Sequence, residues 1–321
     1  MLSIIIPSYN EEKMIAETAQ TIGQIMKENR IPYRILFVND GSSDHTWERI
    51  EEAAKADPQV SGLCFSRNFG KESAMMAGLS YAFNGLPPEE EERSCAAVMD
   101  CDLQHPPQTL VEMYHLWEQG YEVVEGVKRS RGEESAIHRM MVGIFYSIMS
   151  RAVGIDMSRA SDFKLMDRTV VETLVAMPER NAFFRALSSW VGYRTTSVEF
   201  DVQERTEGES KWSTKSLIKY AIRNIVGFSS APMMFVTWAG ALTLLFAIIL
   251  GIQSLVRYFT GHAVEGFTTV ILLLLLIGSV IMISLGIIGV YLANIYEEVK
   301  ARPKFIVSET VGSVSEKQKA G

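Results

Sequence analysis

Two aspartates directly after an apolar run carry the strongest chemical signal in the chain. Asp100 and Asp102 follow residues 96–99, and side chains two positions apart along a strand point the same way. Two converging carboxylates repel each other unless a cation lies between them. Mg²⁺ or Mn²⁺ prefers oxygen ligands and can join carboxylates to a substrate diphosphate. The pair therefore indicates a Mg²⁺ or Mn²⁺ site, with an ordinary Asp-x-Asp turn as the alternative.

A second polar cluster covers residues 39–44, at the end of another apolar run. The carboxylate of Asp40 can accept hydrogen bonds from a base or a ribose, and Gly41 lets another backbone segment approach closely. Helix capping by Ser43 or Asp44 is the simpler alternative. Capping explains one acid but not the whole cluster, so the pattern favours a nucleotide site.

These residues must be positioned by a sheet, because short apolar runs alternate with helical stretches over the first 130 residues. The pattern predicts strands at residues 2–7, 35–38, 62–65 and 96–99. It predicts helices at residues 11–27 and 71–83, and another that follows the 39–44 cluster and ends at residue 55. We expect Asn10 to cap the first helix. Such alternation is typical of an α/β fold with a mostly parallel sheet, whose ligands bind beyond the carboxyl ends of the strands.

Three further segments receive simpler interpretations. Residues 86–93, with two prolines and four consecutive glutamates, are expected to form a solvated loop. Residues 195–202 alternate as a late strand. The tail after Val307 is polar, and we expect it to be mobile.

Two long apolar runs predict a transmembrane hairpin. Residues 231–256 and 267–293 each exceed the roughly 20 residues that a helix needs to cross a bilayer. Two buried helices of a soluble core would show polar stripes, which these runs lack. Basic residues precede the first run and follow the second, so both outer ends are expected in the cytoplasm. Before the first run, residues 211–230 alternate basic and apolar residues, which predicts an amphipathic interfacial helix.

Composition narrows the class of protein further. The formal net charge of −7 argues against a general nucleic-acid binder. The three cysteines, an odd number without metal-ligand spacing, fit a reduced compartment and are interpreted as packing residues. The first apolar run stops at Pro7, too early for a signal peptide, so we expect the N-terminal part to stay in the cytosol.

The motifs resemble those of the family 2 glycosyltransferases, and within that family the polyprenyl-phosphate glycosyltransferases. The resemblance rests on Pro-Ser-Tyr-Asn-Glu-Glu at residues 7–12, the 39–44 turn, Arg-Asn-Phe-Gly-Lys at 67–71, residues 100–107, and Ser-Asp-Phe-Lys-Leu-Met-Asp-Arg at 161–168. It implies a GT-A type, Rossmann-like catalytic domain over residues 1–210, an interfacial helix at 211–230, a hairpin at 231–296 and a cytosolic tail at 297–321. Membrane hairpins that associate into a homo-oligomer are a further implication.

The resemblance also assigns roles to individual residues. The nucleotide and donor pocket would comprise Pro7, Tyr9, Glu11, Asp40, Asp100 and Gln104. Asp100 and Asp102 would meet the metal and the diphosphate, and Asp162 would be the catalytic acid. The chain departs from the family pattern at Ser161, where many members have Glu or Thr before this aspartate.

Cations are needed because two anionic phosphate groups must approach each other. Arg129 and Arg131, in a basic loop, are candidates to clamp a lipid phosphate, with solvated surface charges as the alternative. By resemblance, Arg205 and Lys211 would lie between the diphosphate and the membrane.

The function predicted from these features is inverting transfer of a hexose, glucose or an N-acetylhexosamine, from a nucleotide sugar such as a UDP-sugar to undecaprenyl (polyprenyl) phosphate. The reaction would occur at the cytoplasmic face of the inner (plasma) membrane. Because a phosphate monoester is mostly dianionic near neutral pH, we expect Asp162 mainly to orient the donor sugar or the acceptor, with proton removal as a secondary role. Two alternatives remain: a processive polysaccharide synthase, and a catalytically silent protein that binds sugar nucleotides or transports lipid.

Overall fold

The computed structural model describes residues 1–129, 147, 150, 161–179, 183–201, 231–260 and 266–314. These residues form two compact units, one of Met1–Trp212 with Pro303–Gly321 and the other of Ser213–Arg302. The second unit is therefore an insertion in the sequence of the first, and each is described by itself.

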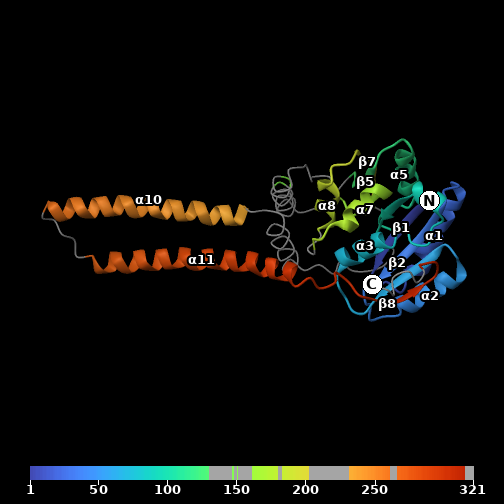
Figure 1. The fold of residues 1–321 in the computed structure, drawn as a ribbon, viewed down its shortest axis with the longest axis horizontal. Helices are drawn as coiled ribbons and strands as arrows, with labels where there is room; N and C mark the ends of the chain where they lie inside the picture. The colour runs from blue at the N-terminus through green and yellow to red at the C-terminus, as the bar shows by residue number, and fades with distance from the viewer. Residues whose placement is uncertain are drawn as a thin grey trace. The chain divides into compact units, whose positions relative to one another are not determined.

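An eight-stranded sheet forms the centre of the first unit (Figure 1). Its strands, in chain order, are β1 (Leu2–Ser8), β2 (Tyr33–Asn39), β3 (Val60–Phe65), β4 (Cys95–Val98), β5 (Val123–Lys128), β6 (Lys164–Asp167), β7 (Thr195–Phe200) and β8 (Val307–Val311). The spatial order is β7-β5-β6-β4-β1-β2-β3-β8. Within the described residues, β6 and β8 run opposite to the other strands, so the predicted mostly parallel α/β fold is confirmed.

Helices cover both faces of this sheet. They are α1 (Ile15–Glu28), α2 (Thr46–Ala56), α3 (Lys71–Ser80), α4 (Pro88–Glu92), α5 (Gln108–Glu118), α7 (Arg168–Ala176) and α8 (Phe184–Trp190). Ile4 and Phe37 share a fully buried core with apolar residues of α1, α2 and α5. On the other face α3 lies so close to β1 that a Cβ on Gly78 would be 2.1 Å from Ile5 Cγ2. That close approach sets the distance of α3 from the sheet, and the first residue of α3, Lys71, lies at the candidate site.

The structure corrects three expectations about local elements. The first helix begins at Ile15, not at residue 11, and Asn10 is not its cap because Asn10 adopts a left-handed φ of 55°. Residues 88–92 form the short helix α4 within the predicted loop, since Pro88 occupies its first position. The tail after Val307 is not mobile over residues 307–311, because they form β8 along the open edge of β3.

The second unit contains two long apolar helices, α10 (Ala231–Phe259) and α11 (Phe267–Val299). They run side by side as an antiparallel pair (Figure 1). Their most apolar segments, Pro232–Ser254 and Leu273–Val299, have mean hydropathies of 2.3 and 2.7 and are not buried in protein. Both are long enough to cross a membrane. The predicted interfacial helix at 211–230 lies outside the described residues.

Candidate active site

The candidate site lies where the strand order reverses, at the carboxyl ends of β1, β2 and β4. The chain places β2 and β3 on one side of β1 and β4 on the other, and parallel sheets bind ligands at such a switch point. Ser8 and Asn39 are paired at the ends of β1 and β2, so the loops after them start side by side. Glu11, Asp40, Asp100 and Asp102 lie in these loops and in the loop after β4, whereas Asp162 lies just before β6.

Hydrogen bonds tie the loop after β1 to the loop after β2. Asn10 N donates to Ser42 Oγ at 3.0 Å, and Ser43 N donates back to Asn10 Oδ1 at 2.9 Å. Glu11 N donates to Thr46 Oγ1 at 2.9 Å. The left-handed conformation of Asn10 therefore serves this loop contact. Tyr9 is 41% exposed in the same loop, beyond the end of β1 that Pro7 belongs to, so its ring is accessible to a ligand.

Asp40 joins a third loop to this pair. Its buried carboxylate accepts hydrogen bonds from the backbone N–H groups of Phe69, at 2.6 Å, and Gly70, at 2.9 Å. Burial raises the pKa of Asp40, and the two N–H donors partly oppose that rise. The loops meet closely, because a Cβ on Gly41 would lie 2.4 Å from the backbone carbon of Arg67. Asp40 thus organises the site's loops, and its direct contact with a nucleotide stays a prediction.

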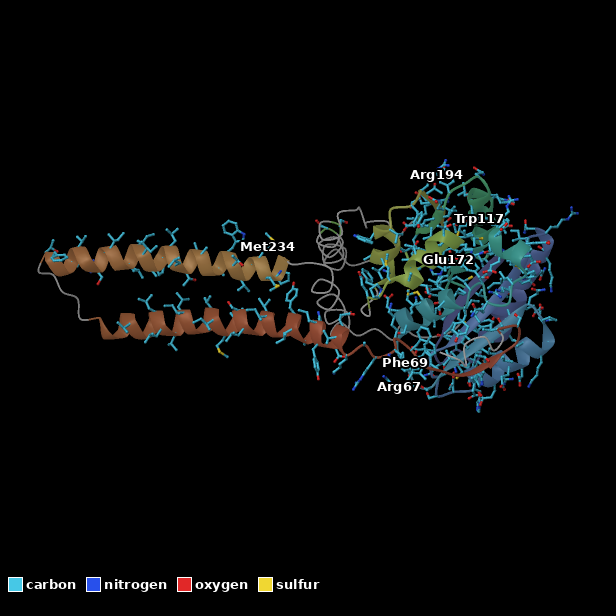
Figure 2. All side chains as sticks on the ribbon, in the orientation of Figure 1. Arg67, Phe69, Trp117, Glu172, Arg194 and Met234 are labelled. Carbon is cyan, nitrogen blue, oxygen red and sulfur yellow. The ribbon has the colours of Figure 1, made fainter. Side chains whose placement is uncertain are left out.

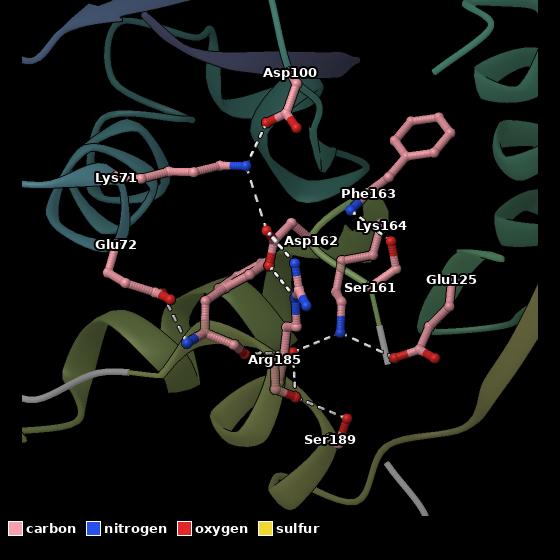
Figure 3. Close-up of polar contacts among 12 residues, drawn as sticks. Lys71, Glu72, Asp100, Glu125, Ser161, Asp162, Phe163, Lys164, Arg185 and Ser189 are labelled. Carbon is pink, nitrogen blue, oxygen red and sulfur yellow. Dashed lines mark hydrogen bonds and ion pairs between the residues drawn. The ribbon is translucent and has the colours of Figure 1, made fainter. Parts of the chain in front are cut away.

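Asp100 and Asp162 are brought together by the antiparallel pairing of β4 with β6. Val98 is opposite Lys164, the last pair of the ladder, and Asp100 and Asp162 each lie two residues beyond this pair. The Lys71 ammonium bridges them, with Nζ 2.5 Å from Asp100 Oδ1 and 3.3 Å from Asp162 Oδ2 (Figure 3). Lys71 is the first residue of α3, directly after Gly70.

Arg185, on α8, forms a second ion pair with Asp162 (Figure 3). Its Nε lies 2.7 Å from Asp162 Oδ1 and its Nη2 lies 2.8 Å from Oδ2, which is the bidentate geometry that binds carboxylates strongly. Burial raises the pKa of Asp162, but Lys71 and Arg185 outweigh it and hold that pKa well below its usual range. Asp162 is therefore ionised across the physiological pH range.

Burial and neighbouring charges also set the pKa values of Lys71, Asp100 and Glu72. Burial opposes the ionised forms of Lys71 and Asp100, but their mutual attraction prevails, so the pKa of Lys71 is raised and that of Asp100 is lowered. Glu72 differs from both, because burial, followed by repulsion from Asp162, raises its pKa to about 7. Its Oε2 accepts a hydrogen bond from Phe184 N at 2.9 Å, at the start of α8.

The loop after β4 contains Asp102 and Gln104, where Asp102 Oδ1 accepts a hydrogen bond from Gln104 N at 3.2 Å. His105 is buried, and its ring stacks on Phe163 with centroids 4.7 Å apart. Burial lowers the pKa of His105, and Asp100 N contacts its Nδ1 at 3.5 Å. These contacts make His105 a packing residue beneath the loop.

Two carboxylates suit a divalent cation only if the substrate supplies further ligands. Within the described residues, no three His, Cys, Asp or Glu side chains converge as a metal cluster. Lys71 shows that a positive charge is accommodated beside Asp100. This donor set fits an ion such as Mg²⁺ or Mn²⁺, which commonly takes one or two carboxylates, with water and substrate phosphate as the remaining ligands.

The recorded ion pairs of Arg129 are with Glu199 and Asp201, and not with the acids of this cluster. Its side chain is 61% exposed, and its guanidinium pairs with Asp201 at 3.2 Å and with Glu199 at 3.8 Å. A lipid-phosphate role for Arg129 stays a prediction. Arg131, Arg205 and Lys211 lie outside the described residues.

Sequence reasoning gave no site role to Lys71, Glu72 or Arg185. Lys71 and Glu72 follow the loop after a predicted strand, and Lys71 belongs to the Arg-Asn-Phe-Gly-Lys motif. Their position in the chain is therefore a signal from which a site role could have been predicted. Arg185 had no local signal, because it follows two phenylalanines in an undistinguished helix and reaches Asp162 only through the packing of α8.

Parallel α/β sheets bind ligands at the switch point, and here the acids of the site gather at that edge of the sheet. Residues 3–175 match the glycosyl transferase family 2 profile. The chain belongs to glycosyl transferase family 2, with a GT-A type fold, and is a glycosyltransferase.

Curated relatives span nearly the whole chain. An uncharacterised glycosyltransferase of Bacillus subtilis is 37% identical, over 97% of this chain and 94% of its own. The bactoprenol glucosyl transferase of Shigella phage SfV is 32% identical over 99% of each chain. The prophage bactoprenol glucosyl transferase homologue of Escherichia coli is 32% identical over 95% of this chain and 98% of its own. Together with the two apolar helices, these relatives indicate membrane association.

Among solved structures, mannosyl-3-phosphoglycerate synthase from Rubrobacter xylanophilus has a TM-score of 0.48 at 14% identity, covering 70% of this chain and 73% of that one. Glucosyl-3-phosphoglycerate synthase from Mycobacterium tuberculosis has a TM-score of 0.45 at 16% identity, covering 71% and 78%.

Proposed function

We propose that this glycosyltransferase moves a hexose, glucose or an N-acetylhexosamine, from a UDP-sugar to undecaprenyl phosphate or a similar polyprenyl phosphate, with inversion at the anomeric carbon. The observation that carries the proposal is the ionised Asp162 held between Lys71 and Arg185, directly beside Asp100. The relatives that are bactoprenol glucosyl transferases support a polyprenyl acceptor.

A phosphate acceptor accounts for an acid that is held ionised. The second pKa of a phosphate monoester is about 6, so most acceptor molecules are dianionic near neutral pH and need no general base. A carboxylate with a strongly lowered pKa is a weak base, which suits Asp162 to orient the donor sugar or the acceptor. The phosphate oxygen then attacks the anomeric carbon, and the bond from that carbon to the nucleoside diphosphate breaks.

Charge in the site is arranged for the departing diphosphate. Asp100 and Asp102 would hold Mg²⁺ or Mn²⁺, with diphosphate oxygens as further ligands, and the ion would stabilise the negative charge of the leaving group. Lys71 and Arg185 keep the charge of Asp162 balanced, so that a second anion can approach. Arg129 and Arg131 are the candidates to clamp the lipid phosphate, and Arg205 and Lys211 would lie between the diphosphate and the membrane.

We also infer that the protein is multi-pass, with α10 and α11 crossing the inner membrane and the catalytic domain in the cytoplasm. Basic residues flank the two helices on their outer ends, among them Lys300 and Arg302 after α11, and positive charge favours the cytoplasmic side. This orientation places a soluble nucleotide sugar and a lipid phosphate on the same side of the membrane.

The test is transfer of label into lipid. Purified protein is incubated with undecaprenyl phosphate, Mg²⁺ or Mn²⁺, and a panel of radiolabelled UDP-sugars and GDP-mannose, and label is counted in the organic phase. Label from one donor, lost in Asp102→Asn and kept in the control Asp57→Asn at the end of α2, is the expected result. Folded protein that binds nucleotide but labels no lipid with any donor would overturn the proposal and favour a silent or transport role.

A further inference from the structure

The segment that follows the second apolar helix returns to the catalytic domain and touches the loop that organises the donor side of the site. Residues 304–311, called here the C-terminal strap, end in β8, which pairs antiparallel with β3. Ser66 N donates to Ile306 O at 3.0 Å, and Ser308 Oγ donates to Cys64 O at 3.0 Å. The strap therefore contacts β3 at the point where the strand passes into the 66–70 loop.

Three aromatic rings continue this contact into the loop. The Phe305 ring stacks on Phe65, with centroids 5.4 Å apart and an interplanar angle of 10°. Phe65 meets the Phe69 ring edge to face, at 5.7 Å and 88°. Arg67 covers Phe69 from outside, its guanidinium carbon 4.1 Å from the ring centroid. In Figure 2, Arg67 and Phe69 are labelled beside the red C-terminal segment.

The far end of this loop meets the chemistry of the site. The N–H groups of Phe69 and Gly70 hold the Asp40 carboxylate, and Lys71, the next residue, bridges Asp100 and Asp162. Gly70 has a φ of 97°, so a tight bend joins the loop to α3. A shift of Phe69 would therefore move the partners of Asp40 and the base of the Lys71 side chain together.

The strap is also anchored independently of Phe305. Trp47 Nε1 donates to Glu309 Oε2 at 3.3 Å, and Lys304 Nζ donates to Met177 O at 3.0 Å. Near its end, a Cβ on Gly312 would lie 2.7 Å from Val60 O, which shows how closely the chain follows β3. Removing the Phe305 ring should thus leave the strap in place while it loosens the loop.

We propose that Phe305 is a positioning residue for the donor site, acting through Phe65 and Phe69 on the loop that holds Asp40 and Lys71. The expected effect on donor kinetics rests on the proposed function, whereas the expected effect of Phe305 on the loop does not. Seven residues, 300–306, separate α11 from β8, so the membrane-spanning part of the chain is covalently continuous with an element of the donor site.

The test compares full-length Phe305→Ala, Phe305→Tyr and Ile306→Ala in detergent. Ile306 is the matched control, because it is the next residue of the strap and its side chain is 50% exposed. Hydrogen exchange of the peptide covering residues 66–71 reports the loop itself. We expect Phe305→Ala to accelerate that exchange and to raise the KM for the nucleotide sugar and the Kd for UDP by about tenfold, with the KM for polyprenyl phosphate unchanged.

Phe305→Tyr, which keeps the stacked ring, should restore both readouts, and Ile306→Ala should match the wild type. Unchanged exchange in Phe305→Ala would overturn the inference whether or not transfer is observed. Faster exchange with an unchanged donor KM, or an equal rise in the KM of both substrates, would overturn its functional half. A wild-type protein that transfers no sugar would instead count against the proposed function, and the exchange comparison would still decide the role of Phe305.

Discussion

Asp162 is set apart from the other acids by the two cations that hold it. Burial alone would raise its pKa, but Lys71 and Arg185 outweigh burial and lower it. The side chain of Asp162 is 13% exposed, so these ion pairs are poorly screened by water. Its charge is thus a fixed part of the site, and its ionisation depends on residues from two different helices.

Arg185→Met should make the transfer reaction sensitive to acid. Without the guanidinium, the pKa of Asp162 rises, so the carboxylate becomes protonated at a pH at which the wild type keeps it charged. We expect kcat/KM to fall roughly 100-fold at neutral pH. The ratio of variant to wild type should fall further as the pH decreases, measured as pH–rate profiles. Arg168→Met, which removes a cation paired with Glu172 on α7, is the control, and a ratio independent of pH would contradict the account.

Glu72→Gln should change how stability depends on pH. The folded-state pKa of Glu72 is raised to about 7, so its neutral form is the one that the fold favours. Its contribution is fully present below its unfolded pKa and is lost as the pH rises through about 7. Relative to the variant, the wild type should therefore lose about 1–3 kcal/mol of unfolding free energy between pH 5 and pH 8.

Denaturant unfolding at several pH values measures this difference, with Glu89→Gln on α4 as an exposed control. Parallel stability curves for the wild type and Glu72→Gln would show that Glu72 does not titrate in this range.

At the scale of elements, the site depends on three loops that lock one another. Gly41 has a left-handed φ of 62°, which favours glycine, and it leaves no room for a Cβ beside the backbone of Arg67. The same loop sequence was interpreted as a nucleotide turn from its composition. The structure adds that the turn must also accept a neighbouring backbone.

Gly41→Ala should destabilise the domain by about 2–4 kcal/mol, because the new methyl group collides with Arg67 in addition to the strain of a left-handed alanine. Gly192→Ala is the matched control, since Gly192 has a φ of 73° and its nearest atom would be 3.8 Å away. That variant should lose only about 1 kcal/mol. Equal losses in denaturant unfolding would show that the contact with Arg67 is unimportant.

Sequence patterns predicted strand ends well because buried parallel strands are continuous apolar runs. The runs that end at Asp40 and Asp100 made both acids visible. The patterns gave no strand at β5 or β6. They also gave none at β8, where Val307 and Val311 flank polar residues and the strand pairs with β3. They also gave no sign of Arg185, since its role follows from the packing of α8 and not from its neighbours in the chain.

At the scale of the whole molecule, the unit with the two long apolar helices is inserted in the sequence between β7 and β8 of the first unit. The predicted catalytic domain of residues 1–210 leaves out residues 303–314, which belong with the sheet and fall within the predicted tail of residues 297–321. A polar tail and an edge strand have similar compositions, and only the pairing distinguishes them.

The proposed topology predicts which positions can be labelled from outside the cell. Thr260→Cys, at the end of α10, should react with a membrane-impermeant maleimide in intact cells. Val299→Cys, at the end of α11, should react only after lysis. The native cysteines Cys64, Cys95 and Cys101 are buried and give a low background. Labelling of both positions from outside would contradict a hairpin with cytoplasmic outer ends.

The most direct test of the proposed reaction is a comparison of two acceptors with the wild-type protein. Undecaprenyl phosphate and undecaprenol are offered separately with the same labelled UDP-sugar and divalent ion, and label is counted in the organic phase. Because Asp162 is held ionised and is a weak base, we predict label with the phosphate and none with the alcohol. Equal labelling of the alcohol would show that the site can deprotonate a hydroxyl, which contradicts the account.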